Sequence, residues 1–97
     1  MKKKVQGRMA ELPQVLAALG DPVRLTIVRH LAEEGSTSCG RFGILMPKSS
    51  LSHHFKVLRE AGIVLTHREG QNQMNQLNRA AMEKSYKGLL KSVLGRG

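Results

Sequence analysis

The segment from Ser49 to Ala61 constrains the fold of this chain most, because it predicts a helix with one apolar and one polar face. At about 100° per residue, its large apolar side chains fall on one stripe, formed by Leu51, Phe55 and Leu58. The opposite face carries short polar groups and charges: Ser49, Ser52, His53, Lys56 and Glu60. Such a helix can pack one face on a core and present the other to a partner, as a helix in the DNA major groove must. Other surface helices share this pattern, so the flanking segments are needed to distinguish a DNA-binding helix from an ordinary surface helix.

Three further helices are predicted before this segment, and the first two of them lie before residue 36. The first starts near Glu11 or Leu12 and ends at Gly20, with apolar residues at helical spacing between them. The pair Asp21-Pro22 is typical of a helix start, with Asp as the N-cap and Pro in the first turn. The second helix then continues to Gly35. His30 lies between apolar neighbours in it and is interpreted as a packing residue rather than a ligand.

A short third helix is predicted over residues 39–46, capped by Ser36 to Ser38. Pro47 forces the residue before it out of a helix and so predicts a tight turn. Two helices joined by such a turn, the second with a polar outer face, form a helix-turn-helix.

The remaining segments predict a hairpin and a last helix. Residues 63–68 are rich in β-branched side chains, 69–73 suit a turn, and 74–78 can return as a second strand. An apolar stripe over residues 79–94 then predicts one helix. The fold class is therefore mainly α with a small β-hairpin (α+β), a winged helix-turn-helix in the order ααααββα.

The charge of the chain favours a polyanion as partner. Sixteen Lys and Arg residues against seven Asp and Glu leave a net charge of +9, and neutralising phosphates with such cations releases counterions. Alternatively, part of the surplus is tail charge, because Lys2, Lys3 and Lys4 lie near one end. We assign residues 1–10 to a mobile basic arm and residues 11–95 to a single domain.

The cysteine content and the lengths of the apolar runs indicate the compartment. Cys39 is the single cysteine, which excludes an internal disulfide and suits a reducing environment. No stretch approaches the ~20 apolar residues of a membrane span, so a cytoplasmic protein is expected. Cys39 itself is either an ordinary half-buried residue or a redox-active thiol.

Three segments resemble the ArsR/SmtB family of winged helix-turn-helix regulators. Ala18 to Leu25 reads Ala-Leu-Gly-Asp-Pro-Val-Arg-Leu and is similar to the family's opening segment. Ser49 to Val64 resembles its recognition helix and first wing strand, and Arg68-Glu69-Gly70 resembles the start of its wing turn. The resemblance implies a homodimer that binds operator DNA and releases it on an inducing signal.

The metal sites of that family are not matched. Its thiol site needs paired cysteines before the recognition helix, where this chain has Cys39 alone. Its second site uses His, Asp and Glu on the last helix, but residues 79–94 contain no His or Asp, and Glu83 is their one acid. His30, His53, His54 and His67 form no ligand set on one element. We therefore expect no metal and no cofactor.

The predicted contacts with double-stranded DNA lie on the recognition helix and in the wing. They are Lys48, Ser49, Ser50, Ser52, His53, Lys56, Arg68, Gln71, Asn72 and Gln73. His53 lies opposite the apolar stripe and is the best candidate for a base contact, whereas His54 lies beside the stripe and is expected to pack. Lys48 and Arg41 could widen the phosphate footprint. In the wing, the alternative is a polar turn without a partner.

The first and last helices carry more apolar surface than a small core needs, which predicts a homodimer with this interface: Leu12, Val15, Leu16, Leu19, Met82, Tyr86, Leu89, Leu90, Val93 and Leu94. Alternatively, both helices pack on their own domain.

The expected function is a sequence-specific, homodimeric DNA-binding repressor. The alternatives are a winged-helix protein-interaction or assembly module and a non-specific nucleic-acid binder. The sequence shows no catalytic constellation, so no enzyme is expected.

Overall fold

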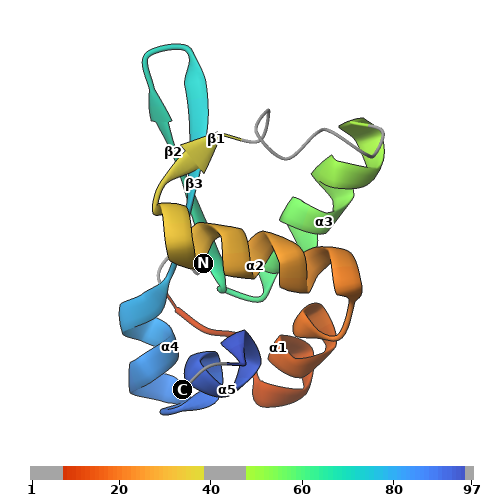
Figure 1. Cartoon of the computed structure of the whole chain (residues 1–97), viewed down its shortest axis with the longest axis vertical. Coiled ribbons are helices and arrows are strands. Elements are labelled where there is room, and N and C mark those ends of the chain that lie inside the picture. The colour runs from red at the N-terminus through yellow and green to blue at the C-terminus, as the bar shows by residue number, and fades with distance from the viewer. Residues whose placement is uncertain (1–7, 39–47, 96–97) are drawn as a thin grey trace, which may run out of the picture.

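The computed structural model describes residues 8–38 and 48–95, and its elements follow the order of a winged helix-turn-helix (Figure 1). In this part of the chain, the helices before the hairpin are α1 (Leu12–Leu19), α2 (Pro22–Glu34) and α3 (Lys48–Glu60), and a short strand β1 (Thr37–Ser38) follows α2. The hairpin consists of β2 (Val64–Glu69) and β3 (Asn72–Leu77), and the helices after it are α4 (Arg79–Ser85) and α5 (Leu89–Leu94). The predicted fold class is confirmed. The helix predicted over 39–46 lies outside the described residues.

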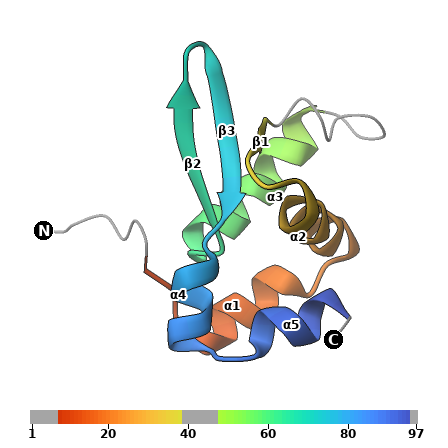
Figure 2. The same ribbon diagram turned by 60° about the vertical axis from the view of Figure 1, so that its left-hand side comes forward.

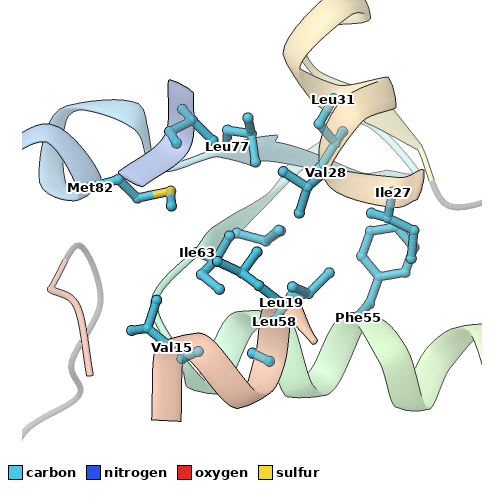
Figure 3. Close-up of a cluster of buried hydrophobic side chains, with 14 of the residues drawn as sticks. Val15, Leu19, Ile27, Val28, Leu31, Phe55, Leu58, Ile63, Leu77 and Met82 are labelled. Atoms are coloured by element: carbon cyan, nitrogen blue, oxygen red, sulfur yellow. The ribbon is translucent and has the colours of Figure 1, made fainter. Parts of the chain in front are cut away.

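The hydrophobic core lies where the helices meet the base of the hairpin (Figure 3). Phe55 of α3 is its one aromatic ring among the buried residues described, and aliphatic side chains surround it. The largest fully buried members are Phe55, Ile27, Leu31, Leu58, Ile63, Met82, Val15, Val28 and Val64. Burying a side chain of this size contributes about 1.5–3 kcal/mol. The predicted stripe of α3 is thus the face that anchors it.

The carboxylate of Asp21 fixes the start of α2, as the sequence predicts. Its Oδ2 accepts hydrogen bonds from the backbone N–H groups of Val23 and Arg24, at 2.9 and 3.0 Å. The bond from Arg24 N–H is the main cause that lowers the pKa of Asp21 below its ordinary value. The cap is therefore charged at neutral pH, which suits the positive end of the helix dipole.

The strands form one antiparallel sheet in the order β1-β3-β2. The β2–β3 register runs from Val64 opposite Leu77 to Glu69 opposite Asn72. Ser36 to Ser38 were expected to cap a helix, but Thr37 and Ser38 instead pair with β3. A strand of two residues has no periodicity of its own, so its partner in β3 defines it.

A buried amide joins the three strands at the base of the hairpin. Asn75 is fully buried; its Oδ1 accepts a hydrogen bond from the Thr66 hydroxyl at 2.7 Å, and its Nδ2 donates to the Thr37 carbonyl oxygen at 3.4 Å. Because this inward position carries Asn, the apolar alternation of the strand is interrupted. The return strand accordingly begins at Asn72 and not at Met74, and the turn is confined to residues 70–71.

The single helix predicted over 79–94 is wrong: two short helices occupy this region. α4 ends at Ser85, and Gly88 adopts a left-handed conformation with φ 83° before α5 begins. Glycine reaches this conformation without the steric cost that other residues meet. The apolar stripe continues across the break, which is why periodicity alone did not reveal it. None of the described helices is long and apolar enough to cross a membrane.

Residues 8–10 belonged to the expected arm, yet they lie across the junction of α3 and β2. The Ala10 N–H donates to the Ala61 carbonyl oxygen at 3.0 Å, and the Tyr86 hydroxyl donates to the Ala10 carbonyl oxygen at 2.8 Å. A Cβ at Gly62 would collide with the Arg8 carbonyl oxygen. The packed part of the chain therefore begins before Glu11.

We predict that Gly62→Ala destabilises the protein more than Gly70→Ala does. Both glycines have positive φ, 84° and 63°, so either substitution strains the backbone by about 1–2 kcal/mol. At Gly62 the new methyl group also meets Arg8, whereas at Gly70 nothing lies within 4 Å. Urea unfolding should give Gly62→Ala the larger loss, by roughly 1 kcal/mol or more. Equal losses would contradict the close approach of residues 8–10.

Candidate nucleic-acid interface

The outer face of α3 presents the predicted polar side chains to solvent. Ser49, Ser50, Ser52, His53 and Lys56 are all exposed. Lys48 is the first residue of the helix. The helix is thereby divided into an anchored face and a free face, in the way its sequence predicts.

The cation on this face is weakly held. Lys56 Nζ lies 4.0 Å from Glu60 Oε2, and both side chains are exposed by more than half (63% and 61%). An exposed pair of this kind contributes about 0.3–0.5 kcal/mol. Glu60 therefore competes little with a phosphate for Lys56.

The two neighbouring histidines of α3 have different environments. His53 is exposed, whereas the side chain of His54 is 16% exposed and its Nδ1 lies 3.0 Å from an Arg24 guanidinium nitrogen. Since Arg24 can only donate, Nδ1 is the acceptor of this hydrogen bond. The interpretation of His54 as a packing residue is confirmed.

Arg24 connects three helices at one point. Besides its contact with His54 of α3, its Nε donates to the Ala18 carbonyl oxygen at 2.6 Å, and a terminal nitrogen donates to the Ala17 carbonyl oxygen at 3.4 Å. These carbonyls belong to the last turn of α1, which has few helical partners left for them. Sequence reasoning missed this role, although Arg24 stands in the Ala18 to Leu25 segment.

The hairpin projects from the body of the domain, as Figure 2 shows. Near its tip, Arg68 pairs with Gln73 and Glu69 with Asn72, and Gln71 lies in the turn. The predicted wing residues Arg68, Gln71, Asn72 and Gln73 are all exposed. In Figure 1 the hairpin and the start of α3 extend beyond α2 on the same side of the molecule. The two elements that carry the predicted contacts thus extend from the same side of the domain.

The chain is similar to known transcriptional regulators. A family model described as a helix-turn-helix domain matches residues 19–67. The uncharacterised HTH-type transcriptional regulator YceK of Bacillus subtilis is 34% identical over 83 residues, which covers 82% of this chain and 83% of YceK. Among solved structures, the transcriptional repressor BigR from Xylella fastidiosa is 31% identical with a TM-score of 0.60, covering 77% of this chain and 85% of BigR. An ArsR-like transcriptional regulator from Rhodococcus sp. RHA1 shares the fold, with a TM-score of 0.69 at 22% identity and coverage of 84% and 77%.

This chain belongs to the ArsR-type helix-turn-helix transcriptional regulators. The resemblance noted in the sequence is confirmed. The family and its fold are those of DNA-binding regulators and not of enzymes.

The structure divides the residues predicted for the dimer interface of this regulator. Val15, Leu19, Met82 and Leu90 lie in the domain's own core and have little or no surface to offer a second chain. Leu12 and Leu16 are 41% and 49% exposed. Tyr86, Leu89, Val93 and Leu94 are half-buried at the edge of the core. The exposed part of the predicted face is therefore centred on α1.

Several candidate residues of this regulator do not converge on a site. Cys39 and Arg41 lie outside the described residues. Across 8–38 and 48–95, no group of three or more His, Cys, Asp or Glu side chains is placed to hold a metal ion. His30 is half-buried in α2, in agreement with its interpretation as a packing residue.

We predict that His54→Ala destabilises the regulator while His53→Ala does not. The first substitution removes the acceptor of the Arg24 hydrogen bond, which should cost about 1–2 kcal/mol. The second truncates an exposed side chain and should stay within about 0.5 kcal/mol. Both raise the helix propensity of α3 equally, so His53→Ala is a matched control. Chemical unfolding measures the difference, and similar midpoints for the two variants would refute a structural role for the Arg24–His54 contact.

Proposed function

We propose that this regulator is a homodimeric, sequence-specific repressor that places α3 in the major groove of operator DNA, with the β2–β3 hairpin as a wing. The observation that carries the proposal is the free polar face of α3, held on the core by Leu51, Phe55 and Leu58. Because a protein that binds operator DNA must share a compartment with it, the proposed location is the cytoplasm.

The chemistry of that face suits a duplex. Serine hydroxyls and backbone N–H groups at the start of a helix bind phosphate, and the helix dipole favours negative charge there. His53 and Ser52 lie further along the helix, where side chains reach base edges. Lys56, held only by its exposed ion pair with Glu60, can bind phosphate or guanine. Phosphate contacts set the register of the helix, and His53 and Ser52 supply the sequence preference.

The wing extends the footprint of α3. Arg68 supplies a cation, and Gln71, Asn72 and Gln73 supply amides at an exposed tip. Such groups bind the minor groove or its phosphates. With a net charge of +9, the chain would bind with an affinity that falls steeply with salt.

A second copy completes the operator complex. In Figures 1 and 2, α1 and α5 lie side by side. The exposed leucines of α1 and the half-buried apolar residues of α5 are the surface that a two-fold related copy would cover. Two recognition helices would then lie about one DNA turn apart, roughly 34 Å. BigR is named a transcriptional repressor, which supports repression as the mode of action.

Operator selectivity should depend on His53 and Ser52. We expect His53→Ala and Ser52→Ala to lose about 1–3 kcal/mol of discrimination between the operator and unrelated DNA, because they remove contacts to base edges. Lys56→Gln should instead weaken both complexes and reduce the salt slope by about 1.8, because each of the two copies loses one phosphate contact. Fluorescence anisotropy on DNA from upstream of the protein's own gene measures both quantities. Wild-type binding that does not distinguish the two DNAs would refute a sequence-specific regulator.

Dimerisation should depend on the exposed face of α1. Leu16→Glu would place a charge on the apolar surface, and we expect a monomer by light scattering, with far-UV circular dichroism unchanged. Gln14→Glu adds the same charge at an exposed position of the same helix, at the loss of one exposed hydrogen bond to the Glu60 carbonyl oxygen at 3.3 Å, and serves as control. A Leu16→Glu protein that remains dimeric would exclude this face as the interface.

A further inference from the structure

A pocket of about 360 Å³ lies between α2, α4 and α5. In Figure 1, α4 and α5 lie at the end of the molecule opposite the tip of the hairpin. Its apolar lining consists of Ala32, Leu90 and Leu94. Leu90 is buried in the core and the other two are half-buried. This volume is within the range of small-molecule sites, which are about 300–1,000 Å³.

Charged side chains from all three helices surround this apolar lining. Arg29 and Glu33 come from α2, Arg79 and Glu83 from α4, and Lys91 from α5. Within the described part of the chain, no ion pair of 4.0 Å or less joins any of them. The rim therefore carries three cations against two carboxylates, and these charges do not neutralise one another by direct contact.

One of the cations is already oriented. A terminal nitrogen of Arg79 donates to the Ala32 carbonyl oxygen at 2.9 Å, which ties α4 to α2 across the pocket. The guanidinium has further N–H groups that can bind a carboxylate or phosphate in a fixed geometry. A guanidinium held in this way loses less freedom on binding than one that is mobile.

We infer that this pocket binds a small organic anion with an apolar body and that the ligand is an effector of DNA binding. The excess positive charge selects the anionic head, and Leu90 and Leu94 receive the apolar part. Leu94 also belongs to the predicted dimer face, and α2 carries Arg24, which contacts the recognition helix through His54. The effector role rests on the proposed function; the binding site itself does not.

The binding site is tested without DNA, with octanoate as probe and octylammonium as its cationic counterpart. In an NMR titration of the ¹⁵N-labelled protein, octanoate should shift the amide signals of α2, α4 and α5, and octylammonium should bind more weakly. No saturable shifts with octanoate, or equal binding of octylammonium, would overturn the site.

Variants locate the probe. Arg79→Gln should weaken octanoate binding about five- to tenfold, because a charge-assisted hydrogen bond at a solvated rim is lost. Arg68→Gln removes the same charge on the distant wing and should leave the affinity for octanoate unchanged. It is therefore the control for long-range attraction of the anion by the net positive charge of the protein. Glu83→Gln should strengthen binding by removing a repulsive carboxylate. Equal effects of Arg79→Gln and Arg68→Gln would mean that the anion binds elsewhere, which overturns the proposal.

The effector role is tested by operator titration with and without saturating octanoate. Octanoate should change the operator Kd of the wild type by about fivefold or more, the lower range of allosteric coupling, and should change that of Arg79→Gln less. An unchanged wild-type Kd with the pocket occupied would overturn the effector role. Failure of the ligand-free protein to bind DNA specifically would refute the proposed function and leave the binding site standing.

Discussion

The side chain of Arg24 sets the relative placement of the helices that matter for DNA binding. Its hydrogen bonds reach the last turn of α1 and the imidazole of His54 in α3, while its own backbone N–H is bound by Asp21 at the start of α2. A planar guanidinium with five donors can satisfy several acceptors at fixed angles, which an ammonium cannot do in the same way. The helix proposed to read DNA is thereby tied to the helix whose exposed leucines are proposed to form the dimer.

A second polar residue fixes the wing in a comparable way. Asn75 is fully buried, so its amide has to be satisfied by hydrogen bonds, and Thr66 and Thr37 provide them. A slip of the register by one residue would turn this amide away from its partners and move Leu77 out of the core. The wing therefore keeps its direction relative to α3, although its tip is exposed.

The parts of the fold that the sequence predicts well are those with local signals. α3 was predicted from Ser49 to Ala61 and runs from Lys48 to Glu60, because its stripe and its closing Gly62 are read within one segment. β1 could not be predicted, since its two residues are a strand only through their pairing with β3. Gly88 interrupts the last helix without interrupting the apolar stripe.

In the candidate site too, the features with local sequence signals could be predicted and the others could not. Which residues of α3 face outward follows from helical period, and the structure agrees at His53 and His54. Period cannot say whether an apolar stripe is covered by its own domain or by a second chain. Leu16 and Val15 are neighbours in α1, yet one is half exposed and the other fully buried. The Arg24 contacts and the pocket depend on residues distant in sequence, which no local pattern brings together.

The helix α2 links these features in one rigid element. Its first turn holds Arg24 and so the recognition helix, and its second half lines the pocket with Arg29 and Glu33. If a ligand between α2 and α5 binds one position of α2 more tightly than another, it shifts the population toward the position that it binds better. The size of this shift is limited by the difference in binding free energy between the two positions. A displacement of α2 along its axis would strain the hydrogen bonds of Arg24 to α1 and α3 together, because hydrogen bonds lose strength steeply away from their preferred geometry. Coupling between the pocket and DNA therefore needs no contact between them, only a second stable position of this helix.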